Sequence, residues 1–126
     1  MMTYAFSTAT RERLTKAILS HAQACYPQEC CGLVILTRDG HQYLPCINAS
    51  PEPRRHFSLT PEDYLKASAA GTIIALVHSH PDGPPELSPA DRLGLTHSAC
   101  SWWLVCCGRI YCFGTEDEHD HDHCLS

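Results

Sequence analysis

Long hydrophobic runs, an excess of basic residues and C-x-x-C motifs are all missing from this sequence of 126 residues. The longest aliphatic run, Ile73–Val77, has five residues, whereas a helix that crosses a bilayer needs roughly 20. The chain does not begin with a basic and then apolar stretch, so a signal peptide is not expected. We therefore expect one soluble, cytoplasmic domain with no membrane partner.

Basic residues are few, with nine Lys and Arg against 14 Asp and Glu. Five of the acids fall in the last 11 residues, which leaves nine acids and nine bases in the rest of the chain. Binding to nucleic acid depends on basic side chains that displace counterions from phosphates. A nucleic-acid partner is therefore not expected.

The nine cysteines include no C-x-x-C pair, and at about 7% they fall below the composition of a small disulfide scaffold. Cys30-Cys31 and Cys106-Cys107 are adjacent pairs, and neighbouring side chains on a strand point to opposite faces. We expect small buried thiols in a reducing compartment. A thiolate metal site and a disulfide remain the alternatives.

Local patterns predict a mixed β-sheet with helices packed against it. A helix over 8–25 is expected from its apolar spacing, with Thr8 or Thr10 as its cap. Asp39-Gly40 indicates a hairpin. The complete expected order is helix 8–25, strands 29–37, 42–47 and 56–59, a helix between Thr60 and Gly71, strand 72–80, helix 88–100, and strands 102–107 and 109–113.

Two histidines at the end of a predicted central strand are candidate metal ligands. His78 and His80 are two residues apart, so both imidazoles leave the same face of the strand. Asp91 follows in the first turn of the next predicted helix. Two histidines, one carboxylate and an open position form the donor set of a catalytic zinc site. The ordinary alternative is a pair of structural histidines at a strand end.

Asp91 also has a purely structural interpretation, because Ser88-Pro89-Ala90-Asp91 has the form of a helix capping box. Thr60-Pro61-Glu62-Asp63 has the same form with no H-x-H pair before it. The box alone therefore predicts only the start of a helix.

Glu29 and Ser88 are the candidate catalytic residues. Glu29 lies at the mouth of an apolar strand, where its carboxylate could accept a proton from water on the metal and pass it to a leaving amine. Ser88 could donate a hydrogen bond to the carbonyl oxygen as negative charge develops on it. An exposed glutamate and a capping serine are the alternatives.

Taken together, these residues resemble the JAMM motif of the MPN-type zinc metallopeptidases. Glu29-x-x-Gly32, His78-Ser79-His80-Pro81, Ser88 and Asp91 fill every position of that motif. The resemblance implies an α+β fold in a single JAMM/MPN-like domain over 1–113. It also implies one zinc ion on His78, His80 and Asp91, with Glu29 as general acid/base and Ser88 steadying the tetrahedral intermediate.

A second, looser resemblance is to the N-terminal domain of the tail assembly protein K family of tailed phages. It is carried by 56–63 and 102–106. It implies a phage tail-tip protein as the substrate, whereas the JAMM resemblance implies a protein or peptide substrate with a Gly-rich C-terminus. Those proteins usually continue into a cysteine-peptidase domain, whereas 114–126 is acidic and His-rich, and we expect it to be a disordered tail.

Three alternatives to phage tail processing remain open. The first is processing of a ubiquitin-like sulfur-carrier protein, and the second is a scaffold of the same fold that acts by docking alone. The third is metal storage by the many cysteines and histidines. The three alternating histidines His119, His121 and His123 could also chelate a metal.

Overall fold

The computed structural model describes residues 6–114. The expected tail lies outside the described residues except for Gly114. No helix in the described part is long and apolar enough to cross a membrane. The elements are α1 (Thr8–Cys25), β1 (Cys31–Thr37), β2 (Gly40–Cys46), α2 (Pro61–Ala70), β3 (Thr72–Ser79), α3 (Pro89–Thr96), β4 (Ser101–Cys106) and β5 (Arg109–Phe113).

The five strands form one mixed sheet in the order β2-β1-β3-β4-β5. β3 and β4 run parallel, with α3 in the connection between them, and the other neighbouring strands are antiparallel. β3 is therefore the central strand, as its nearly continuous apolar sequence predicted. The expected α+β architecture, a mixed sheet flanked by helices, is confirmed.

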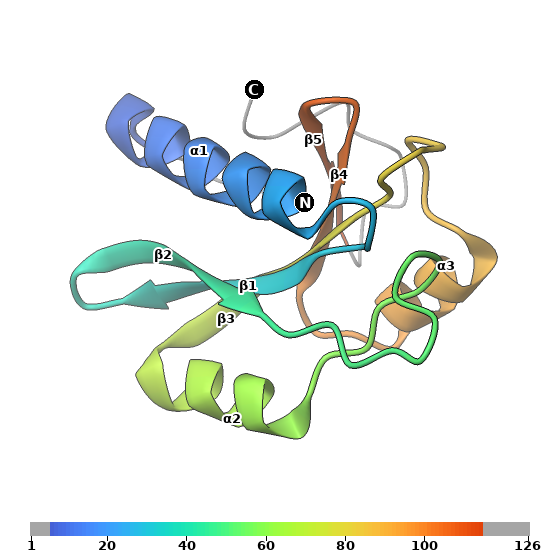
Figure 1. Cartoon of the computed structure of the whole chain (residues 1–126). Coiled ribbons are helices and arrows are strands. Elements are labelled where there is room, and N and C mark those ends of the chain that lie inside the picture. Colours follow the sequence, from blue (N-terminus) through green and yellow to red (C-terminus); the bar gives the residue numbers. More distant parts are fainter. Residues whose placement is uncertain (1–5, 115–126) are drawn as a thin grey trace.

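Helices cover both faces of the sheet, and Figure 1 shows α1 and α2 on opposite sides of it. Leu14 and Ile18 of α1 are fully buried against one face, together with Val77 and Trp103. On the other face, α2 packs over β1 and α3 packs over β4. Because side chains alternate along a strand, His78 lies on the face opposite Val77, the one covered by α2 and α3.

The helix starts agree with the sequence in two of three cases. The Thr60 and Ser88 side chains accept hydrogen bonds from the third residue of their helices, as predicted. The cap of α1 is Ser7, whose hydroxyl accepts from the Thr10 backbone, and not Thr8 or Thr10. The prediction was wrong by one residue at the cap because three hydroxyl residues compete within four positions.

Two predicted elements are shorter in the structure by four or more residues or lost as a strand, whereas the strand expected over 29–37 begins two residues later, at Cys31. The strand expected over 56–59 is reduced to a single bridge between Asn48 and Leu59. The helix expected to reach Cys100 ends at Thr96, since His97 caps it and the Ser98 hydroxyl accepts from the Cys100 backbone. That side-chain bond competes with continuation of the helix.

The cysteines depart from expectation in two ways. Seven of those described are free thiols, as expected, but Cys112 is disulfide-bonded. Cys106 and Cys107 do not face opposite sides, because Cys107 lies in the turn after β4 with a φ of 58°. Their sulfur atoms are only 3.3 Å apart.

Candidate metal centre

The C-terminal end of β3 is hydrogen-bonded on both sides, which fixes the backbone at His78 and His80. On the β1 side, the Cys30 backbone N–H donates to the Ser79 hydroxyl at 2.8 Å, and the Ser79 N–H donates to the Cys30 carbonyl. On the β4 side, the His80 N–H donates to the Val105 carbonyl at 2.9 Å. The strand therefore presents its histidines on a rigid backbone.

His78 is fully buried between aromatic rings. The Phe57 ring stacks on its imidazole at 4.7 Å between centroids, and Trp102 meets it edge-on at 5.6 Å. Burial lowers the pKa of His78, against the opposing effect of Asp91. A neutral imidazole is the form that binds a metal.

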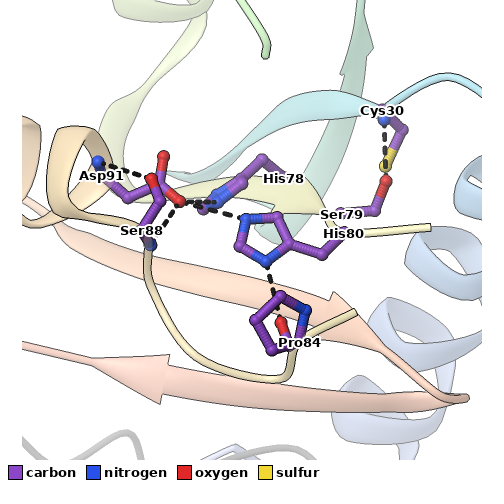
Figure 2. A network of polar contacts seen from close by, with 7 residues as sticks. All are labelled: Cys30, His78, Ser79, His80, Pro84, Ser88 and Asp91. Carbon is purple, nitrogen blue, oxygen red and sulfur yellow. Dashed lines mark hydrogen bonds and ion pairs between the residues drawn. The ribbon is translucent and has the colours of Figure 1, made fainter. Parts of the chain in front are cut away.

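Asp91 and Ser88 form a complete capping box at the start of α3. The Asp91 N–H donates to the Ser88 hydroxyl and the Ser88 N–H donates to Asp91 Oδ2, both at 3.1 Å. The same Oδ2 lies 3.2 Å from His78 Nε2 and 3.1 Å from His80 Nε2. Figure 2 shows the carboxylate reaching from the helix toward both imidazoles. Capping and contact with the histidines therefore occur together, and are not alternatives.

This arrangement fits a bound cation. Nδ1 of His80 lies 2.9 Å from the Pro84 carbonyl, and a carbonyl oxygen only accepts, so Nδ1 carries a proton. Nε2 of His80 therefore faces the Asp91 carboxylate with either a proton or a metal ion between them. Burial alone would lower the pKa of His80, but its hydrogen bonds with Asp91 and Pro84 raise it. Hydrogen bonding of the second ring nitrogen to a carbonyl is typical of metal-binding histidines.

The donor atoms of His78, His80 and Asp91 all lie within 4.8 Å of one another. Burial by itself would raise the pKa of Asp91, but hydrogen bonds from the two histidines outweigh it and hold that pKa well below its usual range. The carboxylate is therefore ionised. This group can bind a metal ion, as the sequence predicted, and imidazole and carboxylate donors suit zinc among the common ions.

The fold brings Glu29, which precedes β1, close to the group of His78, His80 and Asp91. It is only 5% exposed, and burial raises its pKa to about 7, with His80 opposing and Asp91 adding to the shift. Its carboxyl thus lies within electrostatic range of two of the three donor residues. The alternative of an exposed glutamate at a strand start is wrong.

The segment that holds Glu29 was not singled out from the sequence. The Asn48 side chain donates to the Glu29 carbonyl at 3.0 Å and to the His56 carbonyl at 3.0 Å, and it accepts from the Ser58 N–H at 3.1 Å. These bonds bracket Phe57, the residue that stacks on His78. Asn48 therefore ties the backbone at Glu29 to the aromatic wall of the metal group. From the sequence, the prolines that follow Asn48 indicated only a loop.

Ser88 retains a hydrogen to donate. Its hydroxyl oxygen accepts from Asp91 in the cap, which leaves the hydroxyl proton available to an acceptor placed beside the histidines. The sequence left open whether capping would occupy this group, and the geometry shows that capping uses only its acceptor function.

The chain belongs to the family described as prokaryotic homologs of the JAB domain, whose family model matches residues 11–119. The resemblance to the JAMM/MPN family inferred from the motif is thereby confirmed. Its relatives include two phage tail tip assembly proteins and a desampylase. The chain is 43% identical over 95 residues to the tail tip assembly protein K of Escherichia phage N15, a match covering 75% of this chain and 39% of that protein.

Two further relatives widen this comparison. The tail tip assembly protein K of Escherichia phage lambda is 54% identical over 55 residues, covering 44% of this chain and 28% of that protein. The desampylase of Haloferax volcanii is 30% identical over 106 residues, covering 71% and 73% of the two chains. The chain thus spans well under half the length of its phage relatives, but most of the length of the desampylase.

Solved structures share the fold. Protein DSY2949 from Desulfitobacterium hafniense superposes with a TM-score of 0.70 at 22% identity, over 91% of this chain and 90% of that one. AF2198, a JAB1/MPN domain protein from Archaeoglobus fulgidus, gives a TM-score of 0.57 at 19% identity, over 87% and 89%. The fold is therefore that of a single JAB/MPN domain.

Proposed function

We propose that this protein is a zinc-dependent peptidase or isopeptidase that hydrolyses an amide bond, with one zinc ion on His78, His80 and Asp91. The observation that carries the proposal is the convergence of two imidazoles and one ionised carboxylate within 4.8 Å. Three protein ligands with a fourth position open are the usual composition of a catalytic zinc site. Zinc bound there would lower the pKa of water toward about 7 and polarise a substrate carbonyl.

Glu29 serves as the general acid/base in this proposal. Its pKa, raised to about 7 by burial, lets it both accept and return a proton near neutral pH. It takes a proton from the attacking water and gives it to the leaving nitrogen. Ser88 donates its hydroxyl proton to the carbonyl oxygen as charge develops there.

We further propose that the substrate is a protein, and that the reaction belongs to the assembly of a phage tail tip. The matches to two tail tip assembly proteins support this assignment. The desampylase relative favours a second candidate, a protein substrate with a Gly-rich C-terminus such as a ubiquitin-like sulfur carrier. A scaffold that acts by docking alone would need neither the metal nor Glu29.

The test is incubation of the zinc-loaded protein with phage tail-tip proteins and with carrier proteins that end in Gly-Gly. Mass spectrometry then locates any new terminus. Glu29→Gln keeps the size and shape of the side chain but cannot act as a base. We expect it to retain zinc while losing about 10²–10⁴ in rate, the usual contribution of a positioned acid/base.

Two outcomes would contradict parts of the proposal. Near wild-type cleavage by zinc-loaded Glu29→Gln would remove Glu29 from the mechanism. Absence of cleavage by the wild type, together with phage assembly undiminished in Glu29→Gln, would favour the docking scaffold.

A further inference from the structure

Two adjacent thiols meet at the turn between β4 and β5, and neither belongs to the group of His78, His80 and Asp91. Cys106 ends β4 with a buried side chain, whereas Cys107 is exposed. Their Sγ atoms are 3.3 Å apart. This distance is far longer than a disulfide bond of about 2.05 Å, so the pair is a dithiol.

The turn itself does not explain the second cysteine. Cys106 pairs with Arg109, so Cys107 and Gly108 form a two-residue hairpin loop, with φ values of 58° and 75°. Loops with two positive φ angles favour Asn, Asp and Gly, because a side chain such as that of cysteine is strained there. Strained residues of this kind are often retained for a functional reason. Here the left-handed backbone turns the Cys107 sulfur to the side of the Cys106 sulfur.

A disulfide between these neighbours is disfavoured by the short backbone between them. Adjacent Cα atoms are about 3.8 Å apart, below the usual range of about 4.4–6.8 Å for bridged cysteines. Such a bond is strained and easily reduced. The pair is better suited to hold one ligand between two sulfurs than to close on itself.

We propose that Cys106 and Cys107 form a dithiol site for soft, thiophilic ligands, of which trivalent arsenic is the representative. Paired sulfur donors select soft ions, and they distinguish this site from the imidazole and carboxylate donors at the end of β3. A methyl group at Gly83 would lie 3.9 Å from the Cys106 sulfur. The site therefore borders the loop whose Pro84 carbonyl holds His80.

The binding step is a condensation. An organic arsenic oxide, R–As=O, forms two As–S bonds with the two thiols. Its As=O bond and both S–H bonds break, and the oxygen leaves as water with the two thiol protons. No oxidant is needed, because neither arsenic nor sulfur changes oxidation state. Burial raises the pKa of Cys106 to about 11, with the neighbouring thiol adding to the shift, so the Cys106 thiol carries the proton that it releases.

The experiment uses the reduced full-length chain, one equivalent of phenylarsine oxide and an excess of 2-mercaptoethanol. Native mass spectrometry should show one adduct per chain that survives the monothiol and is removed by 2,3-dimercaptopropanol. After trypsin, the adduct should map to the peptide Leu93–Arg109. An adduct on any other peptide would overturn the proposal.

Matched variants identify the two sulfurs. In Cys107→Asn, a residue that the turn prefers, we expect a melting temperature at or above that of the wild type and retention of the arsenical lower by at least about 10², as two-point attachment is lost. Cys107→Gly provides the same test should the Asn variant not fold. Cys100→Ala, in the same peptide, should keep the adduct.

A second control addresses Cys31 and Cys46, which face each other across β1 and β2. The double variant Cys31→Ala/Cys46→Ala should also retain the arsenical. Full retention in both Cys107 variants, or loss of the adduct in either alanine control, would show that the turn dithiol is not the site.

Discussion

Asp91 makes two kinds of contact, and these predict different consequences of its removal. Its Oδ2 atom accepts from the Ser88 N–H and faces both imidazoles. Asp91→Ala should therefore abolish stoichiometric metal binding. The matched control is Asp63→Ala, since Asp63 occupies the same position in α2, but its carboxylate accepts from the Ile47 N–H at an exposed position.

For Asp63→Ala we expect unchanged metal content and a loss of about 0.5–2 kcal/mol in the free energy of unfolding. Elemental analysis and thermal unfolding of the two variants measure the two effects. Equal metal content in both would show that Asp91 is only a helix cap.

Glu29 predicts a pH dependence of stability in the metal-free protein. Burial raises its pKa from 4.5 to about 7 on folding, so the folded state holds the proton more tightly than the unfolded state. Its contribution to stability is complete below pH 4.5 and is lost as the pH rises through 7. The loss can reach about 3 kcal/mol, at roughly 1.4 kcal/mol per pKa unit.

The measurement is urea unfolding of the metal-free wild type and Glu29→Gln between pH 4.5 and pH 8. The Gln side chain does not titrate, so the stability of this variant relative to wild type should increase across that range. Asp91 stays ionised in both folded proteins across this range. His80 titrates in both, with the Glu29 charge helping to raise its pKa only in the wild type. Parallel stability curves would mean that Glu29 is not buried as a neutral acid.

At the scale of elements, the distance between α3 and β4 determines where the Asp91 carboxylate lies. Gly94 of α3 lies against the Trp102 ring, and a Cβ built there would be 2.5 Å from the nearest ring atom. Gly94→Ala should improve intrinsic helix propensity by about 1 kcal/mol. The clash nevertheless forces the helix away from the sheet, and overpacking of this kind costs about 1–3 kcal/mol.

We therefore expect Gly94→Ala to lower both the melting temperature and the metal affinity. Ala90→Gly is the control on the same helix, where an exposed alanine is replaced, and it should cost only propensity. Thermal unfolding measures the melting temperature of each variant, and isothermal titration with zinc measures its metal affinity. An unchanged zinc affinity in Gly94→Ala would show that the helix does not set the position of Asp91.

Elements with strong local signals were predictable, and those decided by distant contacts were not. The α1 periodicity, the Asp39-Gly40 hairpin and the two Pro-containing helix starts reproduce the observed elements. The 56–59 segment failed as a strand because Asn48, eight or more residues away, takes up its backbone groups. The three residues of the candidate metal group could be predicted because they lie within 14 residues of one another.

Other residues of the site could not be predicted from the spacing of residues in the sequence. Phe57 stacks on His78, and Pro84 fixes His80 through its carbonyl. Neither contact has a sequence signature, because a backbone carbonyl and an aromatic ring acquire these roles only when the chain folds. The same is true of Cys107, whose direction depends on the turn geometry.

At the scale of the whole molecule, the proposed metal content is one ion per chain. His119, His121 and His123 lie outside the described residues and form a second candidate group for chelation. Replacing all three by alanine in the full chain should leave one tightly bound zinc, since His78, His80 and Asp91 are untouched. Elemental analysis after extensive dialysis is the measurement, and loss of the ion would assign it to the C-terminal histidines.

The three metal donors come from one short stretch of chain, whereas Glu29 reaches them only through the pairing of β1 with β3. Closing a short loop costs little chain entropy, and long-range strand pairing costs more and forms more slowly. Contacts among these three residues therefore close only a short loop, but a complete site requires the pairing of strands some fifty residues apart. The slower pairing of β1 with β3, and not closure of the 78–91 loop, would then determine how fast a folding chain gains the proposed acid/base beside its metal site.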